Sequence, residues 1–203
     1  MTSGRTIWRR AGTVAVIAAL GAAPVAVRGQ QPAAPPDPFA AVAFLLGLWE
    51  GTSEGQPGTA MVRRDYSRAL DSRFIRVRNR SEYAPQAKNP KGEIHEDEGF
   101  ISYDRVRQRL VLRQFHVEGF VNQYVQEPGA ALVFTSESIE NLPAAWRARE
   151  SYIVHGPDEF EEIFELAEPG KAFAVYSRVR LKRVAARVPA PPAITPEARP
   201  SVP

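Results

Sequence analysis

Residues 92–117, GEIHEDEGFISYDRVRQRLVLRQFHV, decide the fold class predicted for this sequence. Two segments in which apolar and polar residues alternate, 93–103 and 108–117, flank a short polar link at 104–107. A link of this length joins neighbouring antiparallel strands, because parallel strands require a much longer crossover. The stretch therefore predicts a β-hairpin.

The chain after Leu48 repeats this pattern. Turn residues such as Gly-Gln-Pro-Gly at 55–58 and Asn-Pro-Lys-Gly at 89–92 separate segments that are about half apolar, as expected for strands with one face in water. A sheet of many strands is most stable when it closes, because closure removes its unpaired edges. We therefore expect an all-β fold, a ten-stranded antiparallel up-and-down barrel. The ten predicted strands are 48–54, 59–67, 73–83, 93–103, 108–117, 119–126, 131–138, 146–155, 158–167 and 171–184.

One short helix is expected on the N-terminal side of the barrel. Asp37 can cap this helix, Pro38 suits its first position, and FAAVAFLLG (39–47) supplies good helix formers. A barrel of this strand number can enclose a small ligand.

The N-terminus has the composition of a secretory signal peptide. Arg5, Arg9 and Arg10 precede the 17-residue apolar run AGTVAVIAALGAAPVAV, and small residues follow it. Pro24 in so short a run disfavours a retained membrane anchor, which is the alternative interpretation. We therefore expect a bacterial periplasmic or secreted protein with no stable membrane span after signal cleavage.

The predicted domain organisation follows from these changes in composition. Residues 1–29 are the signal peptide, 30–38 a proline-rich linker, 39–184 the barrel domain, and 185–203 a proline-rich tail that we expect to be disordered. The sequence has no cysteine, so the exported protein must be stabilised by its core without disulfides, and a lipid anchor on cysteine is excluded.

The basic excess of the sequence comes from the export signal. The whole chain has 26 basic and 23 acidic residues, a formal charge of +3. Residues 1–29 contain four arginines and no carboxylate, so 22 basic and 23 acidic residues remain after them. The charge is therefore no evidence for nucleic-acid binding, and we expect no nucleic-acid partner.

Strand alternation divides the cluster His95-Glu96-Asp97-Glu98. His95 and Asp97 point to one face of their strand, and Glu96 and Glu98 to the other. A loop at 104–107 sets a register that gathers apolar residues of both strands on the histidine face, which we therefore expect to be inward. The predicted pairs are His95 with His116, Asp97 with Gln114, and Glu98 with Arg113.

His95, His116 and Asp97 are therefore candidate ligand-binding residues in the barrel lumen. A metal site or an acid/base centre formed by the same three residues stays open as an alternative. The run is not an H-E-x-x-H zinc motif, because position 99 is glycine. The sequence also has no phosphate loop, dinucleotide fingerprint or G-x-S-x-G motif.

Two other strands carry rows of basic residues. Arg76, Arg78 and Arg80 alternate along one strand, and we expect them on an exposed face, with an anion-binding rim as the alternative. In the last strand, alternation places Tyr176 on the outward face together with Arg178 unless a bulge intervenes.

The segment FLLGLWEGTSEGQPG (44–58) resembles the opening of the nitrobindin family, haem-binding β-barrels related to lipocalins and fatty-acid-binding proteins. Gly47, Trp49 and Gly51 match the family's G-x-W-x-G-x-G pattern, and Ser53 replaces its last glycine. A second match, to H-x-E-x-G-F, consists of His95, Asp97, Gly99 and Phe100, with aspartate in place of glutamate.

The resemblance implies a calycin-like ten-stranded barrel over residues 39–184, with His95 facing the cavity. It also implies a haem cofactor held by a histidine of the final strand. This chain has no histidine there, and Tyr176 stands at about that position. Tyrosinate can ligate haem iron, so the resemblance makes Tyr176 a candidate ligand.

The function expected from the sequence is binding of a small apolar or amphipathic ligand in the lumen, with haem as one candidate. The alternatives are an interaction module of the cell envelope without a lumen ligand, and a small-molecule enzyme that uses His95 and His116.

Overall fold

The computed structural model describes residues 36–130 and 132–184. The predicted signal peptide and C-terminal tail lie outside these residues. None of the helices in the described part is long and apolar enough to cross a membrane.

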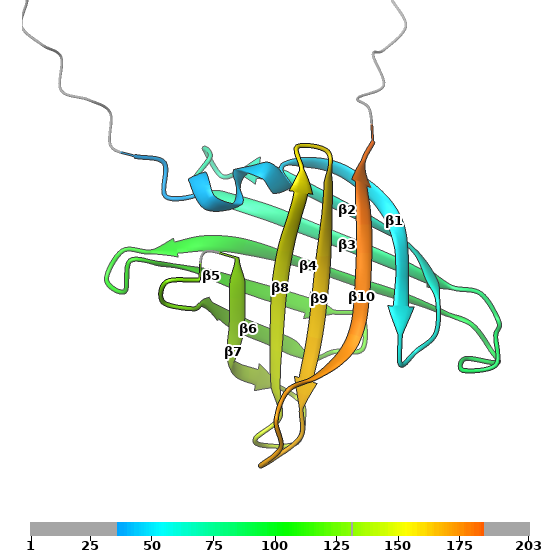
Figure 1. Cartoon of the computed structure of the whole chain (residues 1–203). Coiled ribbons are helices and arrows are strands. Elements are labelled where there is room, and N and C mark those ends of the chain that lie inside the picture. Colours follow the sequence, from blue (N-terminus) through cyan, green and yellow to red (C-terminus); the bar gives the residue numbers. More distant parts are fainter. Residues whose placement is uncertain (1–35, 131, 185–203) are drawn as a thin grey trace, which may run out of the picture. The chain divides into compact units, whose positions relative to one another are not determined.

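Ten strands form one closed antiparallel barrel (Figure 1), which confirms the predicted fold class. The strands follow one another around the barrel in chain order, and β10 pairs with β1 to close it. They are β1 (Gly47–Gly55), β2 (Ala60–Ala69), β3 (Phe74–Tyr83), β4 (Glu93–Asp104), β5 (Arg109–His116), β6 (Val121–Gln126), β7 (Val133–Glu140), β8 (Arg147–Gly156), β9 (Glu159–Ala167) and β10 (Ala174–Arg183).

The strands alternate between a buried and an exposed face, as the sequence pattern predicted. In β2, Ala60, Val62 and Arg64 are buried, and Met61 and Arg63 between them are exposed. A period of two residues is the signature of a strand with one face against a core. In a closed barrel that buried face is the interior.

The single short helix in the described residues is a 3₁₀-helix, η1 (Ala40–Leu45), at the N-terminal side. Contrary to the prediction, Asp37 does not cap this helix. Its carboxylate accepts a hydrogen bond from the backbone N–H of Phe39 at 2.9 Å and forms an ion pair with Arg68. Asp37 therefore stabilises the turn that precedes the helix.

Helix η1 covers one end of the barrel, which we call the closed end. Val42 and Leu45 of the helix are fully buried, and the indole N–H of Trp49 on β1 donates to the carbonyl of Leu45 at 2.6 Å. Phe160 of β9 packs edge-on against the Trp49 ring, with centroids 4.6 Å apart. The Arg183 guanidinium lies over the Trp49 ring, 4.1 Å from its centroid. The closed end is therefore an apolar, fully packed layer.

The register of the β4–β5 hairpin differs from the prediction by two residues. Asp97 lies opposite His116, and Asp104 lies opposite Arg109, so the loop consists of residues 105–108. The side chain of Asp104 accepts hydrogen bonds from the backbone N–H groups of Val106 and Arg107, and Gln108 adopts a left-handed conformation with φ of 53°. These local bonds favour a loop at residues 105–108 instead of the predicted 104–107.

A shift of two residues keeps every side chain on its predicted face but changes its partners. The predicted pairs of His95 with His116 and of Asp97 with Gln114 are therefore wrong as cross-strand pairs. Glu98 and Arg113 do not pair either. Glu98 forms an ion pair with Arg76, and Arg113 forms one with Glu140.

Candidate ligand-binding site at the far end of the barrel

The barrel interior changes from apolar to polar with distance from η1. The next layer contains a buried ion pair between Arg64 of β2 and Glu162 of β9, with nitrogen and oxygen 3.2 Å apart. The Arg64 guanidinium also donates to the Ser81 hydroxyl. Two opposite charges taken out of water need such mutual hydrogen bonds to offset their loss of hydration.

Glu150 of β8 lies in the same buried layer. The hydroxyl of Tyr152 donates to its carboxylate at 2.9 Å. Burial, and next the charge of Glu162, raise the pKa of Glu150 to about 8. Glu150 is therefore mostly neutral at pH 7.

The sequence reasoning missed these three charged residues. The inward-facing positions of their strands hold Arg64, Glu150 and Glu162. On β2, Arg64 lies between the buried residues Val62 and Tyr66, and on β9 Glu162 follows the buried Phe160 by two positions. A charged residue at a position where alternation predicts an apolar one can be seen in the sequence alone, and it could have identified such a buried charge.

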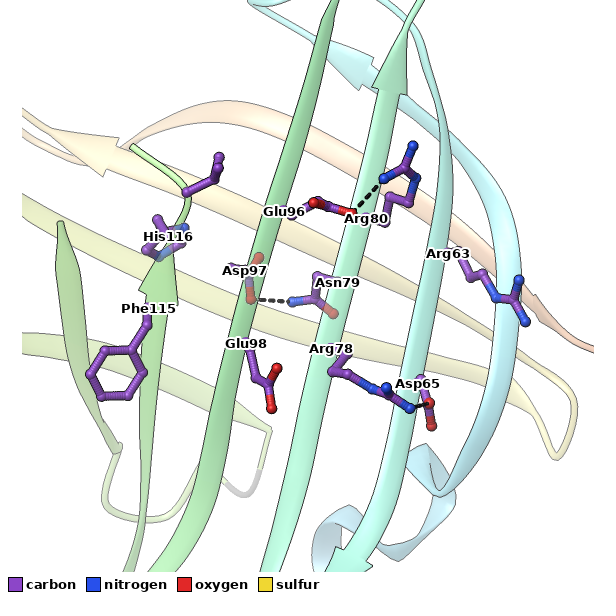
Figure 2. Close-up of a pocket in the computed structure, with 11 residues that line it drawn as sticks. Arg63, Asp65, Arg78, Asn79, Arg80, Glu96, Asp97, Glu98, Phe115 and His116 are labelled. Carbon is purple, nitrogen blue, oxygen red and sulfur yellow. Dashed lines mark hydrogen bonds and ion pairs between the residues drawn. The ribbon is translucent and has the colours of Figure 1, made fainter. Parts of the chain in front are cut away.

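Asp97 is the centre of a hydrogen-bonded group further from η1. Its Oδ1 accepts a hydrogen bond from the side-chain amide of Asn79 at 2.9 Å (Figure 2). It also accepts one from the side-chain amide of Gln114 at 3.2 Å. Burial raises the pKa of Asp97 to about 6, against the opposing charges of Arg64 and His95. The carboxylate fixes the orientation of both amides, since each must turn its NH₂ group toward it.

Four buried polar atoms in this region have no hydrogen-bond partner among the described residues. They are Asn79 Oδ1, Gln114 Oε1, Asn122 Oδ1 and His116 Nδ1. A buried polar atom without a partner is uncommon in folded proteins, and a bound water or ion is one explanation for it. Three of the four are amide oxygens, which accept hydrogen bonds or coordinate cations.

The two histidines lie side by side at this end. Their ring centroids are 5.4 Å apart, and the His116 ring stacks on Phe120 at 4.0 Å. His95 Nδ1 lies 2.7 Å from a carboxylate oxygen of Glu118, and its side chain is 28% exposed. Burial, with the nearby charge of His95, lowers the pKa of His116 to about 4, so His116 is neutral at pH 7.

Three of the four predicted site residues therefore come together. One ligand-type atom from each of His95, Asp97 and His116 lies within 4.8 Å of the other two. The histidine face is directed inward as expected, with Asp97 buried and both histidines half-buried. Asn79, Gln114, Asn122, Glu118 and Phe120 surround this group, and the sequence reasoning did not place them in the site. We call this region, centred on His95, Asp97 and His116, the far-end site.

Tyr176 lies on a bulge. The β9–β10 register shifts between Val175 and Ser177, which are the neighbours of Tyr176, and the ring of Tyr176 packs edge-on against Phe164 at 5.8 Å. The bulge turns Tyr176 into a half-buried position instead of the fully outward one that strict alternation predicts.

The surroundings of Tyr176 do not fit a haem iron. Burial raises the pKa of its phenol, and the carboxylates of Glu93 and Glu118 raise it further, which opposes the tyrosinate form that iron requires. The described part of the final strand holds no histidine as a substitute. Arg64, Glu150 and Glu162 also occupy the barrel interior that a macrocycle would need.

A depression of about 610 Å³ along β2–β5, shown in Figure 2, is lined by outward side chains such as Arg78 and Glu96. Asn79, Asp97 and His116 of the far-end site also line it. Its charges pair with one another: Arg78 with Asp65, and Arg80 with Glu96. The predicted basic row of Arg76, Arg78 and Arg80 is thus on the outer face and neutralised by neighbouring carboxylates. Since exposed pairs of this kind leave little charge for a ligand, we place the candidate site inside the barrel.

Comparison with known proteins supports the fold. No protein-family model and no curated protein matches the sequence. The structure is similar to that of Rv2717c from M. tuberculosis, a β-barrel of the nitrobindin family, with a TM-score of 0.54 and 19% identity over 74% of this chain and 99% of that one. It also aligns with two engineered barrels at a TM-score of 0.40. One is a de novo designed fluorescence-activating β-barrel, at 13% identity over 71% of this chain and 97% of that one. The other is the redesigned barrel mFAP0 bound to DFHBI, at 8% identity over 69% and 99%.

Proposed function

We propose that the protein is an exported β-barrel that binds a small amphipathic ligand at the far-end site, with a hydrogen-bond-donating head group directed inward. The observation that carries this proposal is a pair of buried acceptors without partners among the described residues, Asn79 Oδ1 and Gln114 Oε1. A ligand hydroxyl or amine would supply the missing donors. The expected signal peptide supports a periplasmic or secreted location.

The same end also offers apolar contacts. Phe120 stacks on His116, and Phe164 packs against Tyr176. Aromatic side chains near a few placed polar groups are typical of sites for ligands with an apolar body and a polar end. The fold shared with Rv2717c and the resemblance to the nitrobindin family favour a carrier of the calycin-like kind, and the proposal does not include haem.

Binding of the neutral fluorescent amine N-phenyl-1-naphthylamine tests this proposal. The probe has one N–H donor and an aromatic body, and the titration is made in EDTA so that metal ions do not contribute. Gln114→Met removes one buried acceptor with little change of length, and Arg113→Met changes the outward neighbour on the same strand.

We expect saturable binding to one site and an affinity roughly three- to tenfold weaker for Gln114→Met, because one neutral hydrogen bond is worth about 0.5–1.5 kcal/mol. Arg113→Met is expected to bind like the wild type. Thermal unfolding of both variants checks that they are folded. No saturable binding, or equal weakening by both substitutions, would count against the proposal.

A further inference from the structure

Three metal-ligating side chains converge at the far-end site. His95 and Asp97 lie on β4, two residues apart and on the same face, and His116 lies directly opposite Asp97 on β5. One ligand-type atom of each lies within 4.8 Å of the others. The residues come from two adjacent strands whose backbone hydrogen bonds fix their positions, so the group is held on a rigid part of the fold.

The orientation of His95 is set by a carboxylate. Its Nδ1 lies 2.7 Å from Glu118 Oε1, so this nitrogen carries the proton and donates it to Glu118. The lone pair is then on Nε2, which lies 3.8 Å from Asp97 Oδ2. Histidine ligands of metal ions usually donate their other ring N–H to such an acceptor, which fixes the tautomer and makes the ligand more basic.

Asp97 is held in a comparable way. The hydrogen bonds from the amides of Asn79 and Gln114 both go to Oδ1, and Oδ2 faces His95. Ligand atoms at about 2.1 Å from a tetrahedral zinc ion are about 3.4 Å apart. The 3.8 Å gap between His95 Nε2 and Asp97 Oδ2 is too long for a hydrogen bond and close to the spacing that a shared ion would produce.

His116 supplies a buried nitrogen without a partner. Its Nδ1 has no hydrogen bond within the described residues, and its Nε2 lies 3.3 Å from the side-chain amide of Asn122. With the Asn122 amide turned to accept from Nε2–H, Nδ1 carries the lone pair. Asn122 can adopt this orientation because Tyr124, at 2.7 Å, can donate its hydroxyl hydrogen to the same oxygen.

We propose that His95, Asp97 and His116 bind one divalent transition-metal ion of the zinc class, with Glu118, Asn79 and Gln114 as the groups that orient the ligands. Two imidazoles and one carboxylate favour such an ion over Mg²⁺ or Ca²⁺, which prefer oxygen ligands alone. Three protein ligands leave a coordination position for water or a substrate group, as in catalytic zinc sites. This inference stands without the organic ligand proposed above, since the ion can bind without it.

Titration of the metal-free protein with Co²⁺, followed by visible absorption and competition with Zn²⁺, tests the site. Ligand variants are His116→Gln and Asp97→Asn, and Glu118→Gln tests the orienting carboxylate. The matched controls are Glu98→Gln, on the outer face of the same strand, and His155→Gln, the third histidine of the sequence. Thermal unfolding without metal shows whether each variant is folded.

We expect one equivalent of Co²⁺ with visible bands of a low-coordinate site, displaced by Zn²⁺. His116→Gln and Asp97→Asn should weaken binding by about a hundredfold or more, and Glu118→Gln by about 10- to 100-fold. Both controls should bind like the wild type. The assignment is overturned if the folded protein binds no Co²⁺, or if His155→Gln abolishes binding. It is also overturned if Glu118→Gln abolishes binding while His116→Gln and Asp97→Asn leave it unchanged. That result would place the ion at the rim group of Glu93, His95 and Glu118.

Discussion

Asp97 on β4 lies directly opposite His116 on β5, so a carboxylate and an imidazole meet inside the barrel two residues from His95. Buried amides hold the Asp97 carboxylate, and Phe120 stacks on the His116 ring. The two side chains are thus supported by residues of β3 and β5 and of the loop that follows β5. This support distinguishes the far-end site from the exposed ion pairs of the outer face, which have neighbours but no enclosing contacts.

The buried Arg64–Glu162 pair is expected to be sensitive to loss of one partner. Arg64→Met leaves the Glu162 carboxylate buried without its cation, and we expect a loss of about 3–5 kcal/mol in the free energy of unfolding. Arg64→Met combined with Glu162→Leu should recover most of this loss. Arg78→Met removes the exposed pair with Asp65 and should cost less than about 1 kcal/mol. Denaturant unfolding measures all three, and equal losses for Arg64→Met and Arg78→Met would contradict the account of the interior.

Glu150 is expected to make stability depend on pH. Because burial raises its pKa from 4.5 to about 8, the folded state keeps a proton that the unfolded state loses between these values. The contribution of Glu150 is therefore fully present below about pH 4.5 and is lost as pH rises to 8, with a slope of up to about 1.4 kcal/mol per pH unit.

Glu150→Gln should remove this decline and become increasingly more stable than the wild type as pH rises from about 5 to about 8. Denaturant unfolding at several pH values measures the difference, with the exposed Glu54→Gln as control. A constant difference between wild type and Glu150→Gln across this range would show that Glu150 is ionised in the folded protein.

Gly99 is expected to be intolerant of any side chain. A Cβ atom at this position would overlap the carbonyl oxygen of Arg113 on β5, so the two strands would have to separate. We expect Gly99→Ala to cost at least about 2 kcal/mol, at the upper end of the usual range for single substitutions. Gly156→Ala meets no atom within 4 Å and should change stability by less than about 0.5 kcal/mol. Similar thermal midpoints for both variants would contradict the close approach of β4 and β5.

Tyr176 is expected to play no part in any interaction with haem. Added ferric haem should give the same Soret band with wild type and Tyr176→Phe, because burial and the neighbouring carboxylates Glu93 and Glu118 raise the pKa of the phenol and keep it protonated. A band of the wild type that Tyr176→Phe abolishes would identify a tyrosinate ligand and contradict the stated misfit.

The sequence was sufficient to predict the barrel and the inward face of the histidine strand, because alternation and short polar links are local properties. It was insufficient for the β4–β5 register, since the choice between loops at 104–107 and 105–108 depends on backbone bonds to Asp104 and on the conformation of Gln108. The bulge at Tyr176 likewise depends on how β10 pairs with β9, and the sequence of β10 alone does not determine that pairing.

We predicted from the sequence that His95, Asp97 and His116 lie close together, but the predicted cross-strand partner of His116 was His95 instead of Asp97. A shift of two residues leaves each side chain on the same face of the sheet, so His116 lies opposite Asp97 and still beside His95. The supporting residues come from strands distant in sequence, such as Asn79 on β3 and Asn122 on β6, and only the closed barrel brings them to the site.

The most direct test of the central claim, that the far-end site binds a small ligand, is the NMR spectrum of the three histidine side chains during titration with N-phenyl-1-naphthylamine in EDTA. His155 lies on β8 next to Gly156, where this strand ends at the closed end of the barrel, and serves as an internal reference. We predict that the His95 and His116 signals shift together and saturate at one equivalent, while the His155 signal does not move. Saturable binding that shifts His155, or that leaves His95 and His116 unchanged, would contradict the account.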